Sequence, residues 1–322
     1  MKRGICPEGR VWFTAIAVLV ILLGCREEKN TPAKDTADAA DRTGATVAVA
    51  PSMEQVANAT YQGLRDQPVT LRDGRWEGEP FVENGASRPS VSLEPDFRLT
   101  ADLNRDGTEE AVVLLTEESG GSGRFEYLAV LGRRDGSLVT LGTAFVGDRV
   151  QIRGFRTDAD RIVLDVVQQS AEDEACCPSQ KATRAWSLGQ NGLVEDPPQI
   201  TGQSFLKDLH GIEWVLTRLG PEEPAPAQPE ITLVFDDSGA AGKSACNTYA
   251  AQVIFVVHDS PGGFTLGAIA TTKKACPGEV MTLEENYLER LGAARRWSYH
   301  VGKLAITWET DDGSGVLVYT RR

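Results

Sequence analysis

The sequence predicts a mainly β protein with minor α (α+β), built from two antiparallel β-rich domains, of which the C-terminal one carries one packed helix. Short apolar or alternating segments recur about every ten residues, with Gly, Asp and Asn between them. Over residues 53–200, no helical stripe of ten residues intervenes, which disfavours βαβ units there. A chain of 322 residues is long enough for about two domains at ~100–200 residues each.

We place the two domains at residues 53–200 and 204–322, joined by the linker "EDPPQITGQSF" with its Pro197-Pro198 pair. The first domain opens with a short helix or ordered arm, "MEQVANATYQGL". Its strand candidates are "FRLTADL", "EEAVVLLTEE", "RFEYLAVLGRR", "SLVTLGTAF", "DRVQIRGFRT", "DRIVLDVVQQ" and "TRAWSLGQNG". Those of the second domain are "IEWVLTRL", "EITLVFDDSG", "AQVIFVVH", "GFTLGAIATT", "KLAITWETDD" and "GVLVYTRR".

One segment of the second domain, "MTLEENYLERLGAARRW", has helical periodicity. We expect Thr282 to be its N-cap, with Glu284 in the first turn, where negative charge is favourable. Tyr287, Leu288 and Leu291 fall on one face, so this stripe is expected to pack against the sheet. Glu284 is expected to have a capping or structural role.

The N-terminus has the pattern of a signal peptide over residues 1–24. A basic start is followed by "VWFTAIAVLVILLG", which is too short for a membrane span of ~20 residues. The run ends in Leu22-Leu23-Gly24-Cys25, which resembles the bacterial lipobox, in which the cysteine is lipidated. An uncleaved anchor helix is the alternative. The resemblance implies that Cys25 carries palmitate-type acyl chains and anchors the protein to a membrane.

Residues 25–52 contain almost no large apolar side chain and are expected to form a flexible tether. Arg26 stands where the lipobox resemblance would place an inner-membrane retention Asp. The outer membrane, facing the periplasm, is therefore the expected location, in preference to the inner membrane. The net charge of −13 argues against nucleic-acid binding, because a nucleic-acid-binding protein needs a basic face.

Four cysteines remain in the exported chain once Cys6 leaves with the signal peptide and Cys25 is lipidated. Exported chains retain disulfides. Cys246 and Cys276 flank two strand candidates that could form a hairpin, and we predict that they pair. No histidine stands in a motif relation to Cys246, and no second ligand cluster suggests zinc, so a nucleophile and a metal ligand are both disfavoured.

The segments "FDDSGAAGKSACNTYAAQ" and "LGAIATTKKACPGEVMTLEENYLERL" resemble the META domain family, which includes the heat-inducible HslJ proteins. The resemblance covers residues 204–322 and departs at Ala245, where the family usually has glycine. It implies a compact β domain with one helix in a bacterial envelope protein, often a lipoprotein. It carries over no catalytic reaction.

Cys176 and Cys177 are adjacent and leave three alternatives open: a vicinal disulfide, which we favour, two free thiols, or bonds between chains. The segments "DLNRDGTEEAVV", "GRFEYLAVL", "GDRVQI" and "DEACCP" also resemble a recurring region of bacterial lipoproteins that has no assigned activity.

The loop "ADLNRDGTEEAVVLL" has oxygen-bearing side chains in a calcium-like spacing around Gly107. They are Asp102, Asn104, Asp106 and Glu110. The loop resembles the calcium loops of FG-GAP and dockerin-like repeats, so Ca²⁺ is a possible ligand. The alternative, which we favour, is an acidic β-turn that binds no cofactor.

No catalytic motif is present. We therefore expect a non-catalytic, membrane-anchored envelope lipoprotein that binds an envelope protein or ligand or supports envelope stress tolerance. The alternative is an envelope enzyme or inhibitor that uses a site the sequence does not reveal.

Overall fold

The computed structural model describes residues 49–83, 85–174, 176–220, 223–254 and 261–322. The predicted signal peptide, Cys25 and most of the tether lie outside this range, as does His258. The fold class is confirmed, because the described residues are mainly β with minor α. The first helix, α1 (Met53–Ala57), is shorter than the predicted arm, since Tyr61 already belongs to a strand. Ser52 caps this helix through a capping box with Gln55.

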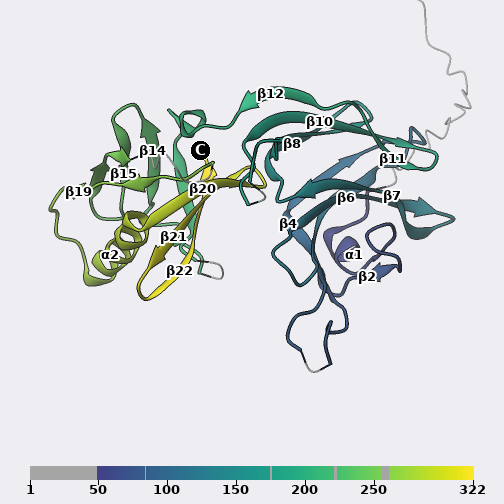
Figure 1. Cartoon of the computed structure of the whole chain (residues 1–322), viewed down its shortest axis with the longest axis horizontal. Helices are drawn as coiled ribbons and strands as arrows, with labels where there is room; N and C mark the ends of the chain where they lie inside the picture. The colour runs from purple at the N-terminus through teal and green to yellow at the C-terminus, as the bar shows by residue number, and fades with distance from the viewer. Residues whose placement is uncertain (1–48, 84, 175, 221–222, 255–260) are drawn as a thin grey trace, which may run out of the picture. The chain divides into compact units, whose positions relative to one another are not determined.

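The N-terminal part contains two five-stranded antiparallel sheets and one small hairpin (Figure 1). One sheet has the order β3 (Arg75–Glu77), β4 (Ser90–Ala101), β5 (Glu110–Glu118), β6 (Phe125–Arg134), β7 (Ser137–Asp148). The other has the order β11 (Gly192–Glu195), β10 (Gln180–Gly189), β9 (Arg161–Gln168), β8 (Gln151–Asp158), with β12 (Gln199–Gln203) also on β10. The hairpin is β1 (Thr60–Tyr61) with β2 (Val69–Thr70).

Strand β5 is buried on both faces, which explains its continuous apolar sequence. Val112 and Leu114 belong to a core shared with the second sheet, where Trp186 is 1% exposed. Val113 and Leu115 point the other way, into a core completed by α1 and the β1–β2 hairpin. The ordered arm therefore covers the outer face of the first sheet.

The predicted linker is wrong in part, because Gln199–Gln203 form strand β12. This strand pairs with β10 in antiparallel register, with a bulge between Lys181 and Ala182. Its five residues are all exposed. The segment lacks an apolar pattern because β12 is an edge strand that buries no side chain, so pairing rests on the backbone alone.

The C-terminal part is built on one eight-stranded antiparallel sheet (Figure 1). The strand order is β19 (Ala270–Thr271), β16 (Thr248–Ala251), β15 (Gly239–Lys243), β14 (Thr232–Asp236), β13 (Trp214–Arg218), β22 (Gly313–Arg321), β21 (Lys303–Thr310), β20 (Ala294–His300). A short hairpin, β17 (Val253–Ile254) with β18 (Thr265–Leu266), and the 3-10 turn η1 (Leu206–Leu209) complete it.

Helix α2 (Gly278–Gly292) packs on this sheet with Tyr287 and Leu291 fully buried and Leu288 partly buried. The predicted packing stripe is thus observed. The predicted N-cap Thr282 is wrong, since the helix begins one turn earlier, after Pro277. Pro277 is the N-cap residue and makes no side-chain capping bond. The first N–H groups of a helix have no intrahelical partner, so a proline, which lacks an N–H, is tolerated where a helix begins. Glu284 consequently lies inside the helix, not in its first turn.

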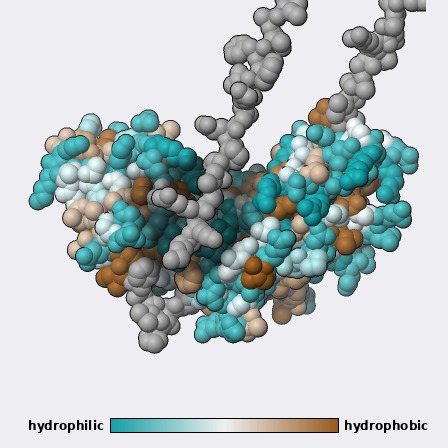
Figure 2. All heavy atoms as spheres, turned by 90° about the horizontal axis from the view of Figure 1, so that it is seen from above, coloured by the Kyte–Doolittle hydropathy of each residue, from teal (hydrophilic) through white to brown (hydrophobic). Residues whose placement is uncertain are grey.

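The surface shown in Figure 2 is mostly hydrophilic, and its apolar side chains form small separate groups. Large apolar side chains that are exposed in the described residues include Phe81, Phe145, Ile200 and Phe205. Among the described residues, no helix has the length and apolarity needed to cross a membrane.

Candidate ligand-binding cleft

Strand β20 alternates between two environments. Trp297 and Tyr299 belong to the C-terminal core, whereas Arg296, Ser298 and His300 are only half-buried. Successive side chains of a strand point to opposite faces of its sheet. The second face of the C-terminal sheet is completed by side chains of three neighbouring strands: Arg218, Ala305, Thr307, Val316 and Val318. This face forms one wall of a cleft.

The opposite wall comes from the N-terminal sheets and the segment before β10. Its residues are Glu94, Leu114, Arg124, Glu126, Arg149, Val150, Gln151, Ile152, Cys176 and Pro178. The cleft has a volume of about 430 Å³, which is within the range of small-molecule sites. Its lining combines apolar side chains with charged groups from both walls.

The turn between β20 and β21 connects the two walls. Val301 at its tip is 6% exposed and packs into the N-terminal core. The amide of Gly302 donates to the carbonyl of Ile152 at 2.9 Å, and the amide of Tyr299 donates to Oε1 of Gln151 at 2.9 Å. Apolar burial and directed hydrogen bonds together fix one end of the cleft.

Two contacts between a basic and an acidic side chain flank this turn. His300 Nε2 lies 3.3 Å from Glu94 Oε2, and the ammonium of Lys303 contacts Asp96. Burial lowers the pKa of His300, although Glu94 and Asp96 favour its charged form. Possible metal-ligating atoms of Glu94, Asp96 and His300 lie within 4.8 Å of one another. Asp96 is paired with Lys303, and Glu94 faces the imidazole of His300, so both carboxylates already have a partner within the cluster.

A second pair lies deeper in the cleft. Arg124 Nε donates to Glu126 Oε1 at 2.9 Å, and Thr116 Oγ1 donates to Glu126 Oε2 at 2.9 Å. Burial raises the pKa of Glu126, whose side chain is almost inaccessible to solvent. The adjacent carboxylates raise the pKa of Arg124, against the effect of its own burial. Glu126 is therefore held by Arg124 and leaves little negative charge toward the cleft.

The structure joins Cys176 to Cys177 at the cleft wall. Cys176 is exposed and Cys177 is fully buried. The guanidinium of Arg296 lies 2.7 Å from Cys177 Sγ and 3.3 Å from the carbonyl of Pro261. The favoured alternative of a vicinal disulfide is thus the one observed, and it lies next to a residue of the C-terminal sheet.

The predicted calcium loop lies apart from the cleft. Both carboxylate oxygens of Asp102 accept loop amides, from Asp106 at 3.0 Å and Gly107 at 2.9 Å. Glu110 accepts from the Leu103 amide and the Asn104 side chain, and its burial raises its pKa. These oxygens lie close together, but they accept hydrogen bonds from the loop itself, which is what an acidic β-turn without a bound ion would show. Calcium binding stays a prediction, which Ca²⁺ calorimetry with alanine at Asp102 and Asp106 tests.

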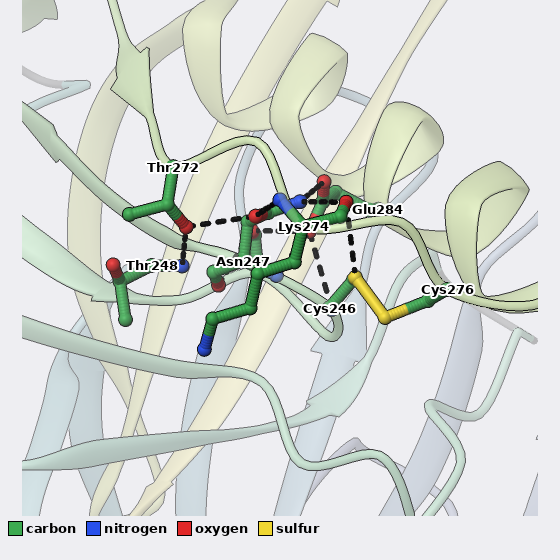
Figure 3. The surroundings of a disulfide bond; sticks show 8 residues. Cys246, Asn247, Thr248, Thr272, Lys274, Cys276 and Glu284 are labelled. Atoms are coloured by element: carbon green, nitrogen blue, oxygen red, sulfur yellow. Dashed lines mark hydrogen bonds between the residues drawn. A yellow bond between two sulfur atoms is a disulfide. The ribbon is translucent and has the colours of Figure 1, made fainter.

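The Cys246–Cys276 disulfide is present, with a Cα–Cα distance of 6.0 Å. It lies beside a buried network centred on Asn247 and Glu284 (Figure 3). Glu284 Oε2 accepts from Ser244 Oγ and the Asn247 amide, both at 2.7 Å, and from the Cys246 amide at 3.2 Å. Every donor belongs to the turn before β16, so the network holds this turn on helix α2. It offers no open position for a ligand, because the carboxylate is 5% exposed.

The side chains of the cleft could not be identified from the sequence. Arg218, Arg296 and His300 come from separate positions on the sheet and share no motif. The only available signal was the alternation in "RRWSYH", which places the basic and polar residues on one face. The residues of the opposite wall come from distant strands, so only the tertiary fold reveals their proximity.

Taken together, the geometry defines a mainly β, disulfide-containing protein with a C-terminal sheet that is covered by a helix on one face and lines a cleft with the other. The C-terminal part of this chain is a META domain, since the family model of that description matches residues 207–322. Searches of curated proteins and of solved structures found no match.

Proposed function

We propose that this chain is a non-catalytic, lipid-anchored protein of the bacterial cell envelope that binds a ligand in the cleft. The cleft carries the proposal. It combines apolar with converging polar side chains, which is the usual composition of a small-molecule site. Binding by this protein would support envelope stress tolerance.

Two further observations support the envelope location. The lipobox-like sequence ending at Cys25 predicts export and lipidation. The two intrachain disulfides fit an oxidising compartment, where such bonds persist. We propose the outer membrane, facing the periplasm, as the site of anchoring, with residues 25–52 as the tether.

The cleft suits binding because its walls are held before a ligand arrives. The buried Val301 and the two hydrogen bonds of the β20–β21 turn fix the wall positions. A ligand entering a preformed site loses less affinity to the ordering of the protein.

A cleft-filling variant tests this proposal. Ser298→Trp places a large ring in the cleft, whereas Ser314→Trp places the same ring at an exposed position on β22, outside the cleft. In a deletion strain, the wild type and Ser314→Trp are expected to restore resistance to detergent and oxidative stress, and Ser298→Trp is expected to fail. Full restoration by Ser298→Trp at equal protein levels would exclude a role for the cleft.

One observation favours a second candidate, an envelope enzyme. His300 contacts Glu94 in the cleft, and a histidine oriented by a carboxylate can act as a general base. Replacing both by glutamine keeps hydrogen-bonding capacity but abolishes proton transfer. Binding without catalysis predicts that the Glu94→Gln/His300→Gln variant still restores the phenotype. Complete loss with an unchanged Tm would favour the enzyme.

A further inference from the structure

In the part of the chain that the structure describes, two of the four arginines that line the cleft have no carboxylate partner. Arg124 pairs with Glu126, and Arg149 pairs with Asp148. Within the described residues, Arg218 and Arg296 form no ion pair, although the chain as a whole carries a net charge of −13. An acidic protein offers many possible partners, so two unpaired guanidinium groups in one cleft need an explanation.

Both arginines belong to the wall formed by the C-terminal sheet. One row of paired residues crosses this sheet from Arg218 through Val318 and Ala305 to Ser298. Arg296 lies two residues before Ser298 and therefore on the same face. With strands about 4.8 Å apart, three steps place Arg218 about 14 Å from Ser298, and two residues of about 3.3 Å along β20 bring the distance between the two arginine backbones to about 16 Å. Two long side chains can converge on a small ligand over that distance.

The space between the two arginines is apolar, with hydroxyl groups at its side. Val318 is 4% exposed and Ala305 is 7% exposed, so together they form a closed base. Ser298 adds a hydroxyl donor, whereas Thr307 Oγ1 donates to the carbonyl of Arg296 at 3.3 Å. This wall contains no Asp or Glu among the lining residues. The wall as a whole therefore offers cationic and neutral donors above an apolar surface.

The acidic side chains of the opposite wall do not cancel this charge. Glu126 is held by Arg124. Glu94 faces His300, but burial lowers the pKa of His300, so this histidine does not neutralise Glu94 near neutral pH. Across both walls, four arginines nevertheless face only two glutamates among the lining residues. Arg296 uses one nitrogen, Nη1, for its contacts with Cys177 and Pro261, and neither is a carboxylate. The electrostatic balance of the cleft is therefore positive toward a bound molecule.

We propose that the cleft takes a small ligand that carries a carboxylate or a phosphate on an apolar body, with Arg218 and Arg296 as its anion contacts. The planar fork of arginine matches both groups bidentately. The apolar body would cover Val316, Val318 and Ala305. This inference rests on the proposed binding function and specifies the chemical class of the ligand.

Calorimetric titration of the lipoprotein in nanodiscs tests the ligand class with three probes that share a phenyl body. Benzoate carries a carboxylate, phenyl phosphate carries a phosphate, and benzyl alcohol carries no charge. Saturable binding of at least one anion, with benzyl alcohol at least tenfold weaker, is the expected result; tenfold corresponds to about 1.4 kcal/mol. The two anions distinguish a carboxylate site from a phosphate site.

Arginine variants locate the contacts. Arg218→Gln and Arg296→Gln are each expected to weaken the anion about tenfold or more. Arg218→Lys keeps the positive charge but loses the planar guanidinium, so its affinity for the anion should lie between that of the wild type and that of Arg218→Gln. The matched control is Arg134→Gln, which removes an exposed arginine at the end of β6, outside the cleft. Tm values confirm that each variant is folded.

Equal affinity for benzyl alcohol, unchanged anion binding in both glutamine variants, or no saturation by either anion in the millimolar range would overturn the proposal. Failure of the anion proposal can be distinguished from failure of the proposed binding function. If the uncharged probe binds and Ser298→Trp abolishes that binding, the cleft is a binding site but not for anions. If Ser298→Trp also restores the phenotype, the binding function itself fails.

Discussion

The side chain of Asn247 donates to Glu284 Oε1 at 2.8 Å and accepts, through its own Oδ1, from Thr272 Oγ1 at 2.7 Å and the Lys274 amide at 2.8 Å. One residue thus joins helix α2, the turn before β16 and the segment after β19 (Figure 3). The disulfide between Cys246 and Cys276 links the same turn to the start of the helix. The turn that contains Cys246 and Asn247 is therefore a structural junction.

Removing the carboxylate of this junction should destabilise the protein strongly. Glu284→Ala leaves the backbone amides of Asn247 and Cys246 without their acceptor beside a buried residue, whereas the Ser244 hydroxyl keeps the Asn247 carbonyl as an acceptor. Unsatisfied buried donors cost about 1–3 kcal/mol each, so a loss of about 3 kcal/mol is expected in urea unfolding. Glu285→Ala, at the exposed neighbouring position, is the control and should change stability by less than about 0.5 kcal/mol. Similar small losses for both variants would show that the network is not stabilising.

The contribution of Glu284 to stability should be lost at acidic pH. Burial alone would raise the pKa of Glu284, but the donors from Ser244, Asn247 and Cys246 outweigh burial and lower it below its ordinary value of 4.5. A carboxylate with a lowered folded pKa contributes stability above its unfolded pKa and loses it as the pH falls. The free energy of unfolding should therefore drop more steeply below pH 4.5 in the wild type than in Glu284→Gln. Parallel curves for the two proteins would contradict this assignment.

Ala245 should be replaceable by glycine with a gain in stability. Its φ is +95°, a conformation that an L side chain adopts only with strain of roughly 1–2 kcal/mol. Glycine adopts it freely but loses more backbone entropy on folding, by roughly 0.5–1 kcal/mol. Ala245→Gly is therefore expected to stabilise the protein by up to about 1 kcal/mol in chemical unfolding. A loss of stability would show that the methyl group contributes more than the backbone strain costs.

The protonation of His300 should make the stability of the protein depend on pH at milder acidity as well. Burial lowers the pKa of His300, and the positive charges of Arg124 and Lys303 lower it further. The negative charges of Glu94 and Asp96 oppose this shift but do not cancel it. The unfolded chain then binds more protons just below the ordinary value of 6.5, so stability falls as the pH drops through this region. His300→Gln should flatten the dependence of Tm on pH between about 7 and 5. An equally steep curve in the variant would assign the titration to another group.

Lipidation of Cys25 is the basis of the predicted membrane anchoring. Labelled palmitate is expected to enter the wild type and to be absent from Cys25→Ala, because the cysteine is the only acceptor in the lipobox-like sequence. The control is Cys246→Ala/Cys276→Ala, which keeps Cys25 and should still be labelled. Label in the Cys25→Ala variant would contradict lipidation at this position.

The sequence predicted the parts of this protein whose signal is local. The apolar segments became strands because alternation and turn residues act over a few neighbours, and the Tyr287–Leu291 stripe became the buried face of α2 for the same reason. Strand β12 was missed because an edge strand buries no side chain. The META resemblance expects glycine at position 245, and the positive φ of Ala245 explains why, since glycine adopts this conformation without strain.

The cleft could not be predicted in this way. Arg218 and Arg296 are 78 positions apart in the chain and meet only because β13 and β20 share a sheet. His300 and Glu94 belong to different sheets altogether. Their proximity is a property of how the β20–β21 turn docks on the N-terminal core, which no sequence pattern records.

The central claim is that the cleft holds a ligand, and native mass spectrometry of the protein released from its own envelope tests it most directly. The wild type and Ser314→Trp are expected to carry an additional small-molecule mass that Ser298→Trp lacks. Identical masses above the polypeptide and its lipid in all three proteins, after gentle release, would contradict the claim.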